Sequence, residues 1–68
     1  MNKDIRRLLR ALEDDGYTWR LSSNGHPIVY APTGERVTTL PGTPSDHRSM
    51  KNALAPLKRR GFQWPPQG

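Results

Sequence analysis

Glycine-centred breaks divide this 68-residue sequence into five short segments, and that division most constrains what the chain can fold into. Two segments have helical periodicity and three have strand character, with breaks at Gly16, Gly25, Gly34 and Gly42 and a stop at Gly61. Glycine suits such positions because it adopts left-handed backbone angles without a steric penalty. Its length makes the chain one small domain at most. A domain of this size buries only about 60% of the surface of its unfolded chain, so its stability is marginal.

Residues 3–15 are predicted to form the first helix. Its apolar residues recur every three or four positions and form one stripe: Ile5, Leu8, Leu9 and Leu12. Asn2 is a suitable N-cap, and Gly16 supplies the position after the last turn. Three arginines lie off the stripe: Arg6, Arg7 and Arg10. A basic run of this kind is usually a solvated helix face, although it can contact phosphate.

Three short runs, 17–22, 27–31 and 36–40, are predicted to form an antiparallel sheet. Asn24-Gly25 indicates a tight turn, because both residues tolerate positive φ, and Pro32–Glu35 indicates a second turn. Alternation along the first run places Tyr17, Trp19 and Leu21 on the face that packs against the helices. The opposite face of the sheet is expected to remain open.

A second helix is predicted between Pro44 and Gly61. Thr43 and Asp46 flank its first turn as a capping pair, and Pro44 suits the first helical position. Pro56 lies inside the pattern, so we expect a kink or a broken last turn there. Residues 1–62 then form the domain, and 63–68 form a proline-rich tail.

The order of these elements is α-β-β-β-α. It predicts an α+β domain in which two helices cover one face of a three-stranded antiparallel sheet. This is the layout of the double-stranded-RNA-binding fold, which recognises RNA by shape, phosphate and ribose hydroxyls. The charge agrees with such a partner, since eleven basic residues face six acidic ones and give a net charge of +5.

His26 is the first candidate for chemistry. It follows the Asn24-Gly25 turn, so the turn places it at the exposed end of a hairpin, where Pro27 favours an extended backbone. Histidine exchanges a proton near neutral pH, which few other side chains do. A single histidine beside a turn is, however, more often a solvated surface residue.

Composition argues against several other classes of protein. The chain has no cysteine, and its two histidines, His26 and His47, have no carboxylate cluster beside them, so we expect no structural metal site and no cofactor. No run approaches the ~20 apolar residues that span a bilayer, and no signal peptide is visible. The cytoplasm is the expected location, and the expected state is a monomer or a weak dimer.

Five short motifs occur in a fixed order between about Asp4 and Trp64: Leu8-Leu9-x-x-Leu12 with Gly16-Tyr17, Gly25-His26, Pro32-Thr33-Gly34, Pro41-Gly42-Thr43 and Gly61-Phe62. In order and spacing they resemble the HicA family of bacterial and phage toxins. The resemblance implies the double-stranded-RNA-binding fold and a ribonuclease that cuts mRNA and is held inactive by a HicB-like antitoxin. The histidine that this family requires, in a Gly-Ser-His-like turn, maps onto His26.

The resemblance also implies a mechanism without metal. A neutral His26 takes the proton from a ribose hydroxyl or protonates the leaving oxygen. Arg20 and Arg36 are expected to contact RNA from the open face of the sheet. His47 is a candidate for the second acid or base and, with Arg48, for a phosphate contact at the start of the last helix. Otherwise His47 is a surface residue.

Two other functions remain open. The first is a basic domain of the same fold that binds nucleic acid or protein without cleaving it. The second is a small phage-type protein that places its basic face on an acidic partner. Loss of RNA cleavage in His26→Ala, with the fold retained, would separate the enzyme from both.

Overall fold

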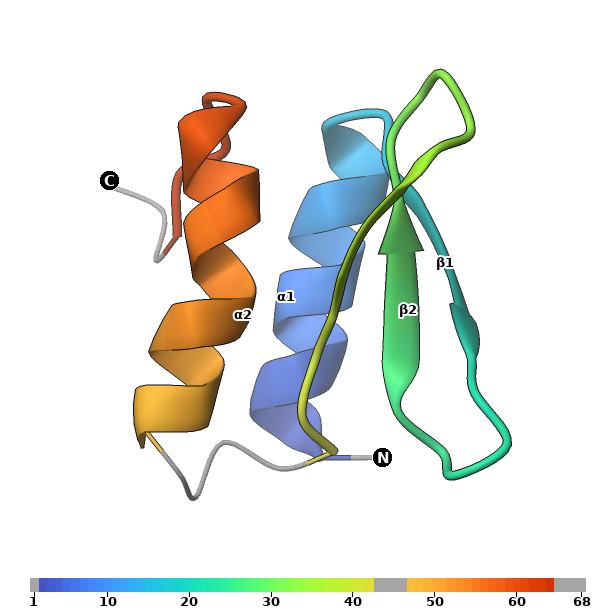
Figure 1. Ribbon diagram of the computed structural model, residues 1–68, viewed down its shortest axis with the longest axis vertical. Helices are drawn as coiled ribbons and strands as arrows, with labels where there is room; N and C mark the ends of the chain where they lie inside the picture. The colour runs from blue at the N-terminus through green and yellow to red at the C-terminus, as the bar shows by residue number, and fades with distance from the viewer. Residues whose placement is uncertain (1, 43–46, 65–68) are drawn as a thin grey trace.

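The computed structural model describes residues 2–42 and 47–64, and it confirms the predicted order of elements. These elements are α1 (Lys3–Asp14), β1 (Thr18–Leu21), β2 (Pro27–Tyr30), β3 (Arg36–Thr39) and α2 (His47–Arg59) (Figure 1). The chain is therefore a small α+β domain with an open three-stranded sheet, in the layout of the double-stranded-RNA-binding fold. The predicted cap of the second helix, Thr43 to Asp46, lies outside the described residues.

Helix α1 begins and ends close to the predicted bounds. The Asn2 side chain accepts a hydrogen bond from the Asp4 amide at 2.8 Å, which confirms the N-cap. All four residues of the predicted stripe are buried: Ile5, Leu8, Leu9 and Leu12. Burial of this stripe against the sheet stabilises the helix, because a helix of twelve residues is marginal on its own.

Both helices end in the same motif, in which a glycine with positive φ precedes a buried aromatic residue. After α1, Gly16 has φ of 94° and the Tyr17 amide donates to the Leu12 carbonyl at 2.9 Å. After α2, the Phe62 amide donates in the same way to the Leu57 carbonyl at 3.1 Å. This Schellman arrangement pairs carbonyls that the helix leaves unpaired, and it turns each aromatic ring back onto the core.

The sheet has the strand order β1-β2-β3, and both pairs of strands are antiparallel. Each hairpin closes through a three-residue loop: the Gly25 amide donates to the Ser22 carbonyl, and the Gly34 amide donates to the Ala31 carbonyl. The glycine alone has positive φ in each loop. The predicted turn is confirmed at Asn24-Gly25, and Asn24 does not need positive φ, because a three-residue loop requires only its last residue in the left-handed region.

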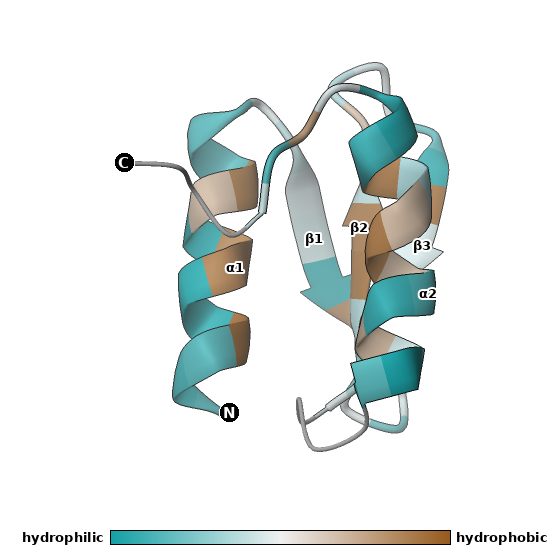
Figure 2. Ribbon diagram, turned by 90° about the vertical axis from the view of Figure 1, so that its left-hand side faces the viewer, coloured by the Kyte–Doolittle hydropathy of each residue, from teal (hydrophilic) through white to brown (hydrophobic). Residues whose placement is uncertain are grey.

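The two helices lie on one face of the sheet, with α1 beside β1 and α2 beside β3, as Figures 1 and 2 show. They run in the same direction. Both therefore begin at the same end of the molecule, where the β1–β2 loop and the end of β3 also lie (Figure 1). The positive ends of both helix dipoles consequently face this end, which favours anions there.

The apolar core forms between the helices and the inner face of the sheet, where Val29, Leu40 and Leu57 are fully buried. Leu21 was predicted to face the helices, but 52% of it is exposed. It is the last residue of β1, opposite Pro27, and the helices do not cover it.

The described C-terminal part of the chain consists of helix α2, which contains Pro56, and a short segment that reaches Trp64. Helix α2 continues through Pro56 to Arg59, so the predicted break in its last turn does not occur. Buried residues on both sides of the proline, Leu54 and Leu57, hold this turn against the core. Trp64 is half-buried and packs against the same core.

Candidate nucleic-acid interface

His26 is exposed, and its backbone is held on both sides by Ser22. The His26 amide donates to the Ser22 hydroxyl at 3.1 Å, and the Ser22 amide donates to the His26 carbonyl at 2.8 Å. The next residue, Pro27, is buried at the start of β2. The loop therefore fixes the Cα of His26, while the imidazole itself makes no hydrogen bond or ion pair with the described residues.

The imidazole lies against Gly42, which belongs to the segment that leaves β3 toward α2. A Cβ at Gly42 would lie 3.4 Å from Cδ2 and 3.7 Å from Nε2 of His26. Two segments that are distant in the sequence thus meet at this ring. Because Gly42 has no side chain, the ring is backed by main chain and one side of it remains open to solvent.

The open face of the sheet carries Arg20 on β1 and Arg36 on β3, with Tyr30 on the strand between them. Arg20 Nε donates to the Tyr30 hydroxyl at 3.1 Å, and the Arg20 guanidinium lies 5.7 Å from the centre of the Tyr30 ring. Arg36 is opposite Tyr30 in the β2–β3 register. The tyrosine holds Arg20 in place, which leaves the terminal nitrogens of Arg20 available to an anion.

Sequence reasoning did not single out Tyr30, although a signal for it was present. Residues alternate between the two faces of a strand, and Val29 faces the core. Its neighbour Tyr30 must then face the open side, where Arg20 also lies. His47 and Arg48 are exposed as the first two residues of α2, whereas Arg20 and Tyr30 lie on β1 and β2.

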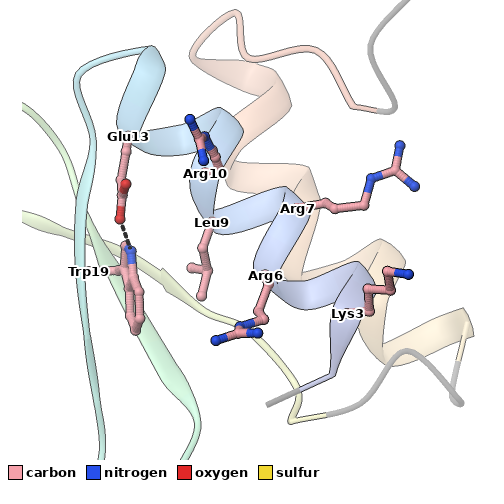
Figure 3. A pocket seen from close by; sticks show the side chains of 7 residues that line it. All are labelled: Lys3, Arg6, Arg7, Leu9, Arg10, Glu13 and Trp19. Atoms are coloured by element: carbon pink, nitrogen blue, oxygen red, sulfur yellow. Dashed lines mark hydrogen bonds between the residues drawn. The ribbon is translucent and has the colours of Figure 1, made fainter.

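A second basic surface, which the sequence did not predict as a site, lies along α1. A hollow of about 490 Å³ opens between α1 and β1 (Figure 3) and is lined by Lys3, Arg6, Arg7, Leu9, Arg10, Glu13 and Trp19. The Trp19 indole donates from Nε1 to the Glu13 carboxylate at 2.7 Å. The four cations of this lining make no ion pair with any described residue. The signal in the sequence was the run of basic residues off the apolar stripe.

The ion pair between Glu35 and Arg60 joins the β2–β3 loop to the end of α2. Arg60 donates to the Glu35 carboxylate at 2.9 Å, and the Thr33 hydroxyl donates to the same oxygen at 2.7 Å. The Thr33 hydroxyl and the Arg60 guanidinium together lower the pKa of Glu35 below its ordinary value. Both ends of the pair are exposed, so it positions the loop and adds little stability.

The part of the chain that the structure describes contains no group of three or more histidines, aspartates or glutamates placed to hold a metal ion. Within that part, neither helix is long and apolar enough to cross a membrane. No family model, curated protein or solved structure matches the chain.

Proposed function

We propose that this protein binds RNA and cleaves it as a metal-independent ribonuclease, with His26 as the acid/base group. The proposal includes the HicA-like role inferred from the motifs, a toxin that acts on mRNA in the cytoplasm and is held inactive by an acidic antitoxin. One observation carries the proposal: the exposed His26 imidazole is backed by Gly42 at the end of the molecule where both helices begin. Helix N-termini favour phosphate, so a phosphodiester would be attracted to this end of the molecule.

The reaction needs only proton transfer and charge stabilisation. A neutral His26 takes the proton of a ribose 2′-hydroxyl, and the 2′-oxygen attacks the adjacent phosphorus. The bond from phosphorus to the 5′-oxygen breaks, and this oxygen receives a proton from the imidazolium or from a second acid, for which His47 is the candidate. The products are a 2′,3′-cyclic phosphate and a 5′-hydroxyl. Arginine side chains stabilise the charge on the phosphate during the attack.

Cleavage of a labelled RNA in EDTA tests this function. Wild-type protein should yield fragments with 2′,3′-cyclic phosphate ends, and His26→Ala should lose about 10²–10⁴-fold in rate, which is the usual contribution of a positioned acid or base. His47→Ala tests the second acid: the rate should fall if His47 protonates the 5′-oxygen, and it should stay unchanged if the His26 imidazolium does so. Circular dichroism checks that each variant is folded. If His26→Ala cleaves as fast as the wild type, His26 is not the catalytic group.

A second candidate function is RNA binding without cleavage. The observation in its favour is that Tyr30 holds Arg20 through a hydrogen bond, whereas no described residue forms a hydrogen bond with the His26 ring. In that case Arg20→Glu and Arg36→Glu should weaken a salt-sensitive affinity for RNA, whereas His26→Ala should leave the affinity unchanged. The wild-type protein should then yield no RNA cleavage products. Recovery of an acidic protein that co-purifies with the chain would support either the toxin or a protein that places its basic face on an acidic partner. Only the cleavage assay separates these two functions.

A further inference from the structure

We propose that the hollow between α1 and β1 binds one unpaired nucleotide of a single-stranded RNA, with the base stacked on Trp19 and the adjoining phosphates on Arg6 and Arg10. This inference rests on the proposed RNA-binding function and specifies the strand type and the residues in contact. It concerns a surface that the cleavage mechanism does not use. Three features of the hollow favour such a ligand: the fixed orientation of the Trp19 indole, the excess of positive side chains and the open shape along α1.

Trp19 is fixed before any ligand arrives. Its Nε1 donates to Glu13 at 2.7 Å, and the inner part of the side chain packs against the apolar core. Figure 3 shows the indole standing on the β1 side of the hollow, with Leu9 and Arg6 between it and the axis of α1. A ring held in this way loses little conformational freedom on binding, so little of the stacking free energy of a base is offset by ordering the side chain.

The charge of the hollow selects an anion. Lys3, Arg6, Arg7 and Arg10 contribute four positive charges, and Glu13 is the single acidic residue in the lining. Glu13 lowers the net charge of the lining from +4 to +3, and it forms no ion pair with the arginines of α1. Arg6 and Arg10 are one helical turn apart and lie on the same side of α1. They can therefore hold two consecutive groups of a negatively charged chain.

The combination of an indole and unpaired cations favours a nucleotide over other anions. A carboxylate peptide would satisfy the arginines but would not use the exposed ring face. A duplex would satisfy them too, but its bases are stacked on one another and cannot reach Trp19. An unpaired nucleotide uses both features, because every base has a face that stacks and every phosphate has a charge. The hollow of about 490 Å³ is open along α1, so the strand can continue beyond the nucleotide that it holds.

Tryptophan fluorescence tests the stacking directly. The chain has two tryptophans, so Trp64→Phe leaves Trp19 as the only one. We combine it with His26→Ala, so that the RNA is not cleaved during the titration. Oligo(U) should quench Trp19, whereas an abasic ribose-phosphate oligomer of equal length should bind about 10-fold more weakly and without quenching. Equal quenching by the abasic oligomer, by an RNA duplex or by polyglutamate would overturn the proposal.

Matched variants separate the hollow from the total charge. The double variant Arg6→Glu/Arg10→Glu should lower the affinity for oligo(U) at least 10-fold more than the control double variant Lys58→Glu/Arg59→Glu. The control changes the net charge by the same amount, but at the end of α2. Trp19→Phe should keep part of the affinity that Trp19→Leu loses. Equal losses in the two charge variants, or equal losses in the two Trp19 variants, would overturn the site.

The binding assay and the cleavage assay test the nucleotide site and the nuclease function independently of each other. If oligo(U) quenches Trp19 but the wild-type protein does not cleave RNA, the nuclease function is wrong and the nucleotide site stands. If the wild-type protein cleaves RNA but Trp19 is not quenched, the site is wrong and the nuclease function stands. Circular dichroism of each variant confirms that the domain is folded in either case.

Discussion

Tyr17 and Phe62 meet edge to face, with their ring centres 6.1 Å apart and their planes at 69°. Each is the aromatic residue that follows the glycine at the end of a helix, so the two helix ends are joined through these rings. Both rings are buried, and aromatic pairs in this geometry add stability beyond the area that they bury. The contact connects the first helix to the segment after the last one, across most of the sequence.

Phe62→Ala should therefore unfold much of the protein at 25 °C. Truncation of a buried phenylalanine costs about 3–5 kcal/mol, and the whole core of so small a domain supplies about the same amount. Urea unfolding followed by circular dichroism measures the change. Phe62→Leu is the control and should cost clearly less, since it leaves a smaller cavity. An unchanged urea midpoint for Phe62→Ala would show that the two helix ends are not joined through this ring.

The two helix-ending glycines should differ in their tolerance of a side chain. Both have positive φ, 94° at Gly16 and 98° at Gly61, so alanine costs about 1–2 kcal/mol at either position. A Cβ at Gly16 would also lie 3.3 Å from Cγ of Pro32, whereas a Cβ at Gly61 meets open space. Gly16→Ala should thus be the more destabilising change in a thermal melt. The opposite order would contradict the close approach to Pro32.

The Glu35–Arg60 pair should make a small contribution to stability that disappears in acid. The pKa of Glu35 is lowered in the folded protein by Thr33 and Arg60. A carboxylate with a lowered pKa stabilises the fold above its unfolded pKa and loses this effect as the pH falls through its folded pKa. Glu35→Gln should melt slightly below the wild type at neutral pH and at the same temperature in strong acid. Salt should shrink the neutral difference, because both partners are exposed. A difference in melting temperature that grows as the pH falls would show that the folded protein does not lower the pKa of Glu35.

Gly42 should control the position of the His26 ring. Gly42→Ala places a Cβ at 3.4 Å from Cδ2, which an exposed ring accommodates with a slight shift, whereas the methyl groups of Gly42→Val reach further and push the imidazole aside. If His26 performs the proposed proton transfer, Gly42→Val should lower cleavage by up to about 10²-fold, since an error of about 1 Å in position has that effect. NMR shifts of the imidazole report the displacement independently of activity. Unchanged imidazole shifts in Gly42→Val would contradict the contact.

Much of the fold follows from signals that act over a few residues. The stripe on α1, the Asn2 cap and the left-handed Gly16 together predict the first helix to within one residue at its C-terminal end. The strands were predicted in the same way, because alternation and turn residues act locally. The face on which Arg20 and Arg36 lie could also be predicted from alternation and the order of the strands.

Local signals misjudged Leu21 and the last turn of α2, because each depends on distant packing. Leu21 is exposed because the helices do not extend over the end of β1. Pro56 lowers helix propensity, yet the helix persists because Leu54 and Leu57 are buried on both sides of it. In each case tertiary contacts outweigh a propensity of a few kcal/mol at most.

The sequence by itself determined the two helices, the three strands and their order, because the residues responsible are neighbours along the chain. The tertiary structure alone decided which distant side chains meet. It placed the ring of His26 against Gly42, joined Trp19 to Glu13 and set that indole beside the arginines of α1. These contacts depend on how the helices pack on the sheet, and that packing is set by the shape of the whole core.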